Sequence, residues 1–472
     1  MPLQFFVRGL SLISFSVAQL FFPLARTLIL ARILSGFEFG FASALAASYS
    51  TFELITDIAI HRFVLASPRS EYRETLAGAH GLSLLRGAAA GMLASAAAPG
   101  LAYMMSLPAD WMSFAWLGLA VFIRSFEHFE VRVAERDYRY NAQLLMNLIS
   151  NGTALVVMIA TWFYVQDHTI YIAMLFAQNI SYVLASHWFA KSPYRFDFRS
   201  AYFRKAARFA YPLVLNGVGL AAVSQGDRLL VGSVLDLPTL GVYSVMMLTV
   251  TVPIGAVIQI SSSLALAGLH NAAADRERLQ CRLLLYMRVM LILGVCFAFG
   301  LLAFMNVLVP FVFGPRFTVA EGIVALLAAL SFLNLARAEP TTSVLLVNHR
   351  TRALAILSLS AVLGLLAATV LALSYGNLYT VVLGRLIGEI FGFAITMTIL
   401  RGYIGELGWR PFIGSWWAGG WIIAAIIFDV FYPLPETSSL RLGIFAALAM
   451  LSVGGLTINL RSMIVRAYSR SS

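Results

Sequence analysis

The sequence predicts an all-α polytopic membrane protein of about fourteen transmembrane helices, with two pseudo-symmetric six-helix lobes plus two C-terminal helices. Composition is the first reason: the 472-residue chain is 60% hydrophobic and only 12% charged, with a mean hydropathy of +0.83. A soluble protein of this length needs far more surface charge. Long apolar runs are the second reason, because about 20 residues with few charges suffice to cross a bilayer as a helix. A membrane β-barrel would instead alternate over about ten residues.

The predicted helices follow one another along the sequence, separated by charged residues or by Pro, Gly and Asn. Pro23, Pro253 and Pro340 lie inside them, where proline bends a helix. We expect the first segment to remain as a helix, because it carries Arg8 and is too long for the apolar core of a signal peptide. The segments cover residues 5–28, 38–65, 81–106, 111–130, 143–164, 170–190, 209–226, 239–266, 283–311, 321–347, 353–374, 379–399, 412–431 and 441–460.

Basic residues predict the orientation of these helices. Of the 33 Lys and Arg residues, 21 lie in the connectors after even-numbered segments or in the C-terminal tail, 3 lie in the other connectors and 9 lie inside segments. Basic residues stay on the cytoplasmic side, so both termini are predicted to be cytoplasmic in a bacterial inner membrane. The net charge of +11 is then a topology signal beside anionic membrane lipid, and it requires no nucleic acid partner.

A sparse internal repeat predicts the domain organisation. Shifting the sequence by 201 residues lays segments one to six on segments seven to twelve. We therefore expect a first lobe over residues 1–208, a second over 209–411, and two additional helices with a cytoplasmic tail over 412–472. The alternative is that short matches arise by chance in apolar sequence. The shift aligns Ile33 with Val234, Leu34 with Leu235, Gly40 with Gly241 and Ser43 with Ser244.

Signals for catalysis or cofactor binding are missing from the sequence. It contains no P-loop, no HExxH motif and no Cys/His metal spacing. Cys281 and Cys296 lie at and within the ninth segment and give no disulfide framework. The longest connector, 191–208, leaves no room for a soluble catalytic domain. We therefore expect no metal, no cofactor and no enzymatic activity, and we expect Asn151 of the sequon in segment five to serve helix packing.

Two stretches carry a family resemblance. RTLILARILSGFEFGFASALAASYSTFELITDIAI resembles the first hairpin of polysaccharide-transporter (Wzx-like) flippases in the multidrug/oligosaccharidyl-lipid/polysaccharide (MOP) exporter superfamily. FAYPLVLNGVGLAAVSQGDRLLVGSVLDLPTLGVYSVMMLTVTVPI resembles the start of their second lobe, through Pro212, Asp227, Arg228, Leu235, Gly241 and Tyr243. The resemblance implies a twelve-helix, two-lobe layout with two added helices. It also implies transfer of polyprenyl (undecaprenyl)-pyrophosphate-linked oligosaccharides from the cytoplasmic to the periplasmic leaflet.

Ionisable residues inside the predicted helices are candidates for substrate binding, because burying charge in hydrocarbon is costly. Arginine suits a pyrophosphate, since its planar fork offers paired donors and keeps its charge. The predicted substrate residues are Arg8, Arg26, Arg337 and Arg385, with Arg124 a weaker candidate. Local pairing is the alternative: Arg385 with Glu389, Arg337 with Glu339 and Arg124 with Glu127, and Arg8 with the membrane interface.

Other polar residues suggest further roles. Asn216 and Gln225, with Gln259, are expected to hydrogen-bond sugar or, alternatively, to join helices. Glu53 and Asp57, with His61, share one face of the second helix and suit coupling to H+ or Na+, unless they pair with Arg62 or Arg26. Gly40 and Gly241 close the two outer hairpins. Asp227 and Arg228 are expected to form a structural ion pair there.

The sequence therefore favours a flippase working by alternating access, driven by an ion gradient, in O-antigen, exopolysaccharide or capsule biosynthesis. Its expected partners are the lipid-linked oligosaccharide, membrane lipid and a polysaccharide polymerase. A multidrug cation/proton antiporter is the alternative within the superfamily, although its cavity should be acidic. A polytopic glycosyltransferase, polymerase or ligase would need a longer periplasmic loop. A non-transporting subunit of a polysaccharide assembly complex is a further alternative.

Overall fold

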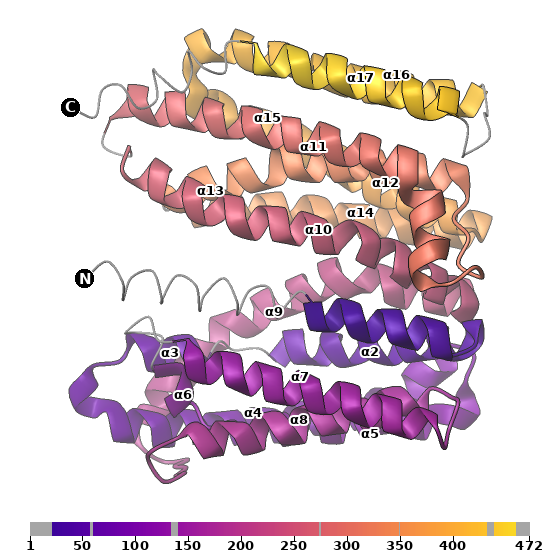
Figure 1. Cartoon of the computed structure of the whole chain (residues 1–472). Coiled ribbons are helices and arrows are strands. Elements are labelled where there is room, and N and C mark those ends of the chain that lie inside the picture. The colour runs from indigo at the N-terminus through magenta and orange to yellow at the C-terminus, as the bar shows by residue number, and fades with distance from the viewer. Residues whose placement is uncertain are drawn as a thin grey trace. The chain divides into compact units, whose positions relative to one another are not determined.

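The computed structural model describes residues 21–56, 60–133, 140–272, 275–348, 350–431 and 439–458, and in these ranges the chain is helical, without strands (Figure 1). Each predicted segment overlaps a helix. The first segment is described only over residues 21–28, which belong to a helix that continues to residue 33. The all-α prediction is therefore confirmed. The contacts between residues divide the chain into two compact units, unit 1 (Met1–Ser244) and unit 2 (Val245–Ser472).

Unit 1 is a bundle of helices that pack in pairs, some between sequence neighbours and some between distant helices. The closest partners are α4 with α5, α7 with α8, and α2 with α9, and α9 also packs along α4. The helices α3 and α6 are short and lie at one end of the unit (Figure 1, left). The elements are α2 (Gly36–Thr56), α3 (Ile60–Ala66), η1 (Arg69–Glu71), α4 (Tyr72–Met104), η2 (Pro108–Asp110), α5 (Trp111–Arg124), α6 (Glu130–Val133), α7 (Asn141–Trp162), α8 (Thr169–Phe189) and α9 (Ala201–Val234).

Unit 2 is built from longer helices, and α10 enters it from the end of unit 1. Here α14 packs on α15, α11 packs on α12 and α17, and α12 packs on α15. The tenth predicted segment is not one regular helix, because the π-helix η4 interrupts it just before Pro340. The elements are α10 (Leu237–His270), α11 (Arg276–Phe313), α12 (Glu321–Leu333), η4 (Asn334–Ala338), α13 (Glu339–Val347), α14 (Thr351–Tyr375), α15 (Leu378–Ser415), α16 (Trp417–Phe431) and α17 (Ser439–Thr457).

Several helices run beyond the predicted apolar segments into polar sequence. α9 begins at Ala201, where the Ser200 side chain accepts a hydrogen bond from the Phe203 amide. α11 begins at Arg276, with the Asp275 side chain capping the amides of Glu277 and Arg278. Such caps satisfy amides that have no partner inside a helix, so they set helix starts independently of the membrane boundary. Hydropathy therefore located the helices but not these ends.

Eight helices of the described chain are long and apolar enough to cross a membrane. Two shorter apolar helices, Ser360–Tyr375 and Trp417–Phe428, add to them. A multi-pass membrane protein is the class that this arrangement defines. The eight spans are Tyr72–Met104, Asn141–Trp162, Thr169–Phe189, Leu237–Ser262, Glu277–Phe313, Gly322–Leu345, Leu378–Gly402 and Leu440–Thr457.

Candidate functional site

A charged cavity lies inside unit 1. It has a volume of about 230 Å³ and is lined by side chains from α2, α3, α4, α5 and the segment that follows α5. Three arginines and two glutamates face it, which gives its charged lining an excess of one positive charge. Isolated charges inside a membrane helix bundle are costly and mark functional sites. The charged lining residues are Glu53, Arg86, Arg124, Glu127 and Arg132.

The irregular segment after α5 brings Glu127 back into this cavity. α5 ends at Arg124, and the Ser83 hydroxyl donates to the backbone carbonyl of Ser125, 2.9 Å away, which fixes the turn to α4. Glu127 then accepts hydrogen bonds from Arg132 Nε at 3.1 Å and from the Tyr182 hydroxyl at 2.9 Å. Arg132 Nη2 also donates to the Tyr182 oxygen. Glu127 is thereby neutralised and held by two helices.

Arg124 and Glu53 differ from Glu127 because neither forms an ion pair with any residue that the structure describes. The Arg124 guanidinium lies 3.3 Å from the ring centroid of Tyr182, a cation–π contact that orients it while leaving its donors available. Glu53 lines the same cavity from α2. The alternative pairing of Arg124 with Glu127 is wrong, since Glu127 pairs with Arg132. Unit 1 therefore presents a cation and a carboxylate to one hollow.

Arg26 belongs to the same unit and is held by amide side chains. Its guanidinium donates to the Gln178 side-chain oxygen, and Gln178 in turn donates to Asn151 Oδ1 at 3.2 Å. A separate bond joins the Tyr49 hydroxyl to Asn179 Oδ1 at 3.1 Å. The packing role expected for Asn151 is confirmed by its bond to Gln178. These amides supply neutral acceptors, so Arg26 keeps a net positive charge within the bundle.

In unit 2, Arg337, one of the predicted substrate residues, has a carboxylate partner on a helix that is distant in sequence. Arg337 lies in the π-helix η4, and its guanidinium forms an ion pair with Glu389 of α15. Only 5% of the Arg337 side chain and 17% of the Glu389 side chain are exposed. The suggested pairing of Arg337 with Glu339 is therefore wrong. A π-turn widens the helix and re-aims its side chains, which explains why spacing along the sequence did not predict the partner.

Two other ionisable side chains of unit 2, Glu339 and Arg385, contact hydroxyl groups or a sulfur atom. The Glu339 carboxylate accepts hydrogen bonds from the Ser343 hydroxyl at 2.7 Å and from the Tyr286 hydroxyl at 3.2 Å. Arg385 is half-buried, and its Nη1 lies 3.6 Å from the sulfur of Met247. Its role as a substrate residue stays a prediction, as does that of Arg337. The ion pair with Glu389 favours a structural role for Arg337, with another partner than the neighbouring Glu339.

The repeated glycines meet each other within unit 1. A Cβ at Gly40 would lie 1.8 Å from the carbonyl oxygen of Leu237, and one at Gly241 would lie 3.5 Å from the carbonyl oxygen of Gly36. Adding 201 to 36 and 40 gives 237 and 241, so these two contacts are equivalent under the repeat. α2 starts at Gly36 and α10 at Leu237, which is the same offset. The first turns of the two helices therefore cross at their glycines, an approach that only small residues allow.

The second outer hairpin is tied by Asp227. Its carboxylate accepts hydrogen bonds from the Tyr243 hydroxyl and, at 2.9 Å, from the backbone amide of Arg228. The Arg228 guanidinium donates to Gln225 Oε1 at 3.3 Å. Gln225 is thus hydrogen-bonded to Arg228 within α9. Its role in sugar binding stays a prediction. The buried aspartate–tyrosine contact fixes α9 against α10.

The remaining predicted residues fall outside what the structure describes. Arg8 and Asp57 belong to ranges that are not described, and so does the side chain of Asn216 on α9. Glu53 near the end of α2 and His61 in α3 both line the cavity of unit 1, and their role in ion coupling stays a prediction. Among described residues no group of three or more His, Cys, Asp and Glu side chains is placed to hold a metal ion.

Sequence reasoning missed part of the interior. Arg86 satisfies the same criterion as Arg26, an arginine inside an apolar segment, and was not singled out. Arg132 lies just past a predicted segment end and was counted as a connector charge. Tyr182 gave no signal, because a tyrosine in an apolar run is equally typical of packing.

Comparisons with known proteins agree with this fold. The structure is similar to "Lipid II flippase MurJ, inward closed conformation", with a TM-score of 0.68 and 14% identity over 96% of this chain and 100% of that chain. It is also similar to an inward-facing multidrug resistance MATE family transporter of the MOP superfamily, with a TM-score of 0.61 and 16% identity over 84% of this chain and 98% of that one. The protein thus has the fold of the MOP superfamily.

A family model narrows this class. The model described as "Polysaccharide biosynthesis protein" matches residues 29–321, and the chain belongs to that family. The resemblance of its hairpins to Wzx-like polysaccharide transporters is thereby confirmed. A search of curated proteins by sequence found no match.

Proposed function

We propose that this protein is a flippase that moves polyprenyl-pyrophosphate-linked oligosaccharides from the cytoplasmic to the periplasmic leaflet of the bacterial inner membrane. The family match supports a role in polysaccharide biosynthesis. The similar structure of a lipid II flippase supports a lipid-linked substrate. The product would serve O-antigen, exopolysaccharide or capsule assembly and pass to a polysaccharide polymerase.

The observation that carries the proposal is Arg124 in the cavity of unit 1. A pyrophosphate and a glycan cannot cross hydrocarbon unaided, so the protein must offer cationic donors inside the bilayer. Arg124 is held by the Tyr182 ring, has no carboxylate partner among the described residues, and faces a hollow with Arg86 and Arg132. A guanidinium in this position offers paired hydrogen bonds to phosphate oxygens. Arg26, whose guanidinium donates to the amide oxygen of Gln178, is proposed as a second cation for the substrate.

Energy coupling is assigned to Glu53, with Asp57 as its neighbour on the predicted helix face. Glu53 faces the cavity without an ion-pair partner in the described chain. A carboxylate in such surroundings is able to exchange H+ or Na+ as the cavity opens to each side in turn. The charge distribution predicts that both termini are cytoplasmic, and the repeat predicts moving lobes over residues 1–208 and 209–411, with residues 412–472 added.

Deletion followed by analysis of lipid-linked intermediates tests the proposal. We expect complete repeat units to accumulate in the cytoplasmic leaflet, where they resist a membrane-impermeant periplasmic glycosidase but become accessible after membrane permeabilisation. Re-expression of the wild-type chain should restore accessibility. Shortened repeat units would instead indicate an enzyme, and unchanged glycan with altered resistance to cationic drugs would indicate a multidrug antiporter.

Coupling has its own test. In inverted membrane vesicles, Glu53→Gln should flatten the pH dependence of substrate transfer while leaving protein abundance unchanged. Arg199→Gln serves as the control, because Arg199 is exposed and does not line the cavity. A wild-type pH profile in Glu53→Gln would remove this residue from the coupling path.

A further inference from the structure

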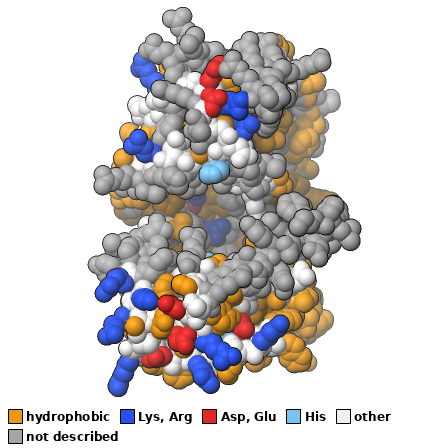
Figure 2. All heavy atoms as spheres, turned by 90° about the vertical axis from the view of Figure 1, so that its left-hand side faces the viewer, with side chains coloured by type: hydrophobic (Ala, Val, Ile, Leu, Met, Phe, Trp, Pro, Cys, Tyr) orange, Lys and Arg blue, Asp and Glu red, His pale blue; other side chains and the backbone are white. Residues whose placement is uncertain are grey.

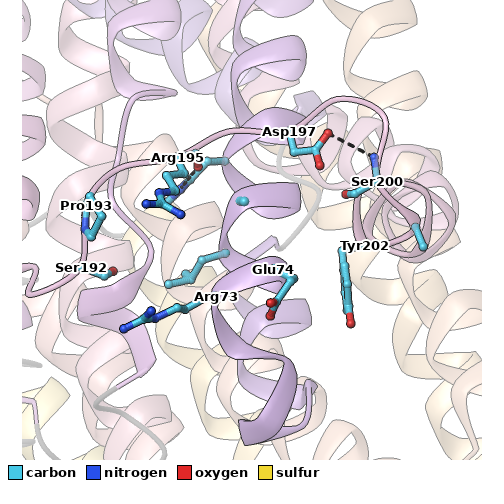
Figure 3. A pocket seen from close by; sticks show the side chains of 12 residues that line it. Arg73, Glu74, Ser192, Pro193, Arg195, Asp197, Ser200 and Tyr202 are labelled. Carbon is cyan, nitrogen blue, oxygen red and sulfur yellow. Dashed lines mark hydrogen bonds between the residues drawn. The ribbon is translucent and has the colours of Figure 1, made fainter.

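A second pocket lies at one end of unit 1, apart from the interior cavity. Its volume is about 500 Å³, and it lies between the start of α4, the connector 190–200 and the first turn of α9 (Figure 3). Figure 2 shows Lys and Arg side chains, with Asp and Glu among them, gathered on the face of unit 1 to which this end belongs. The excess of basic residues predicts that this end faces the cytoplasm. Residues that line the pocket include Arg73, Glu74, Ser192, Arg195, Asp197 and Tyr202.

The connector that forms one wall is held in place along its backbone. Glu130 Oε2 accepts hydrogen bonds from the amides of Lys191 and Ser192 at 2.8 and 2.7 Å and from the Ser192 hydroxyl at 2.7 Å. Burial raises the pKa of Glu130, but these hydrogen bonds outweigh it, so the pKa lies below its ordinary value. The connector is therefore tied by an ionised carboxylate at neutral pH.

Histidine and tyrosine side chains fix the middle of the connector. His80 Nδ1 is 2.9 Å from the carbonyl oxygen of Arg195, and His128 Nε2 is 3.1 Å from that of Ser192. The Tyr194 ring stacks on His80 with centroids 4.3 Å apart. Burial raises the pKa of Tyr194 to about 12, so its phenol stays neutral. An eleven-residue segment without helix or strand is thus held in a defined path.

Glycines on α4 bring the wall directly onto the helix. The amide of Asp197 donates to the carbonyl of Ala77 at 3.0 Å. A Cβ at Gly81 would lie 2.3 Å from the Asp197 carbonyl oxygen, and one at Gly78 would lie 2.7 Å from the Phe203 amide nitrogen. The backbone of the connector and of α9 therefore rests on the surface of α4. The pocket beside this contact is preformed, as ligand sites generally are.

Its charged groups fall into two sets. In the view of Figure 3, the guanidinium groups of Arg73 and Arg195 lie on one side with Ser192, and Glu74 and Tyr202 lie on the other. Both arginines are exposed, and neither guanidinium has an ion-pair partner in the described part of the chain. Glu74 likewise has no ion-pair partner there. The Asp197 carboxylate, in contrast, is engaged by the amides of Arg199 and Ser200.

We propose that this pocket binds a sugar that carries a phosphate group. The guanidiniums of Arg73 and Arg195 bind the phosphate through charged hydrogen bonds. Glu74 and the Tyr202 side chain receive the sugar, the carboxylate by accepting its hydroxyls and the phenol by supplying an apolar ring with a polar tip. A volume of about 500 Å³ is larger than a bare phosphate needs. Glu74 also disfavours a second anion at its end, which selects for a neutral ring.

Two sources offer this chemistry at the cytoplasmic face: a soluble nucleoside-diphosphate sugar, and the sugar–pyrophosphate head of a prenyl lipid. In both cases the site is separate from the charged cavity of unit 1, and its existence does not depend on transport. A soluble ligand would let the supply of activated sugar act on this protein. A lipid head would be held at the membrane surface before it enters the bundle.

Binding to the purified full-length protein in phosphatidylcholine nanodiscs tests the proposal by calorimetry. The soluble probes are UDP-glucose and glucose 1-phosphate, and the lipid probe is a farnesyl pyrophosphate carrying N-acetylglucosamine. We expect Kd for at least one probe to rise at least tenfold in Arg195→Gln and in Arg73→Gln. Arg199→Gln is the matched control, because Arg199 is an exposed arginine of the same connector that does not line the pocket.

The possible outcomes distinguish a soluble ligand from a lipid ligand, and they distinguish failure of this proposal from failure of the proposed flippase function. Weaker binding of a soluble probe in both pocket variants assigns a cytosolic ligand, and the same loss confined to the prenyl probe assigns a lipid head. The proposal is overturned if no probe binds at millimolar concentration, or if the pocket variants bind as tightly as the wild type. It is also overturned if inorganic phosphate binds as tightly as the sugar phosphates. Any of these failures leaves the proposed flippase function standing, because that function is tested by the fate of lipid-linked intermediates.

Discussion

The interiors of the two units handle charge in opposite ways. In unit 1, Arg124 and Glu53 face a hollow of about 230 Å³ without ion-pair partners among the described residues. In unit 2, Arg337 is almost fully buried and its charge is met by Glu389. A charge that is kept near a polar hollow is available to a ligand, whereas a buried pair is satisfied before any ligand arrives. The difference teaches that an arginine inside a membrane helix is not by itself a substrate residue.

The largest expected effect comes from breaking the pair in unit 2. Glu389→Gln removes the counter-charge of Arg337 and leaves a buried cation, which should cost about 3–5 kcal/mol of stability. Thermal unfolding of the purified protein, followed by the loss of monodisperse protein in detergent, measures this change. A variant as stable as the wild type would contradict the structural role of the pair.

A double variant separates stability from substrate binding at the same place. Replacing both charges, as in Arg337→Met with Glu389→Met, should recover most of the stability, because a buried pair is often replaceable by apolar groups. Export of the polysaccharide should then continue. A stable double variant without export would show that Arg337 contacts the substrate after all, and the contrast between the units would fail.

The next effect is expected in unit 1, on transport and not on stability. Arg124→Gln should lower export by about tenfold to a hundredfold, since charged hydrogen bonds to phosphate contribute about 1.5–3 kcal/mol. Protein abundance should remain near wild type, because Glu127 keeps its ion pair with Arg132 and its hydrogen bond from Tyr182 when Arg124 is replaced. The measurement is polymer yield per unit of protein in the membrane, in a deletion strain that expresses each variant.

Arg124→Lys and Arg199→Gln complete this test. Lysine keeps the charge but lacks the planar paired donors, so an intermediate loss is expected. Arg199 is an exposed arginine outside the cavity, and its replacement should leave export unchanged. Wild-type export from both Arg124 variants would remove this residue from the substrate path.

These contrasts also show where sequence reasoning succeeds. The fold class and the helices followed from apolar length, and the repeat offset of 201 gave the shared start of α2 and α10 at Gly36 and Leu237. These features depend on composition and on local spacing. The partners of buried charges depend on which helices lie together, and Arg337 meets a glutamate 52 positions away through a π-turn that hydropathy does not reveal.

The candidate site was predicted only in part, because sequence shows which helices carry charges but not which helices lie together. Arg26 and Glu53 were identified because a charge inside an apolar segment stands out. Tyr182 and Arg132 were not, since their roles arise only when the segment after α5 folds back to place Glu127 between them. Local spacing suggested Arg124 as the partner of Glu127, but the cavity geometry gives that role to Arg132.

A third test extends the comparison to the two repeated hairpins. Gly40→Ala would place a methyl group 1.8 Å from the Leu237 carbonyl oxygen, which is backbone and cannot rotate away. The helices must separate, and overpacking of this kind costs about 1–3 kcal/mol. At Gly241 the nearest atom is Cδ1 of the Phe39 ring, 3.1 Å away, so Gly241→Ala should cost less.

Gly36→Ala is the matched control for the hairpins. It lies one turn from Gly40 on α2, and a Cβ there meets no atom within 4 Å. The substitution should be neutral or stabilising by about 0.4–1 kcal/mol, because alanine has less freedom to lose on folding. Thermal unfolding of the three variants gives their order. Equal effects at positions 36 and 40 would contradict the close crossing of α2 and α10.

Among the substitutions at the cavity of unit 1, the smallest loss of export should come from Tyr182→Phe. The change removes one hydroxyl that donates to Glu127 and accepts from Arg132, but it keeps the ring beneath Arg124 and the ion pair of Glu127 with Arg132. A lost hydrogen bond of this type costs about 0.5–1.5 kcal/mol, and export should stay close to wild type. A cost as large as that of Glu389→Gln would mean that the network of unit 1 is as tightly interdependent as the buried pair of unit 2. Arg124 would then have a structural role, because the positions of Tyr182, Glu127 and Arg132 around it would depend on one another for the stability of unit 1.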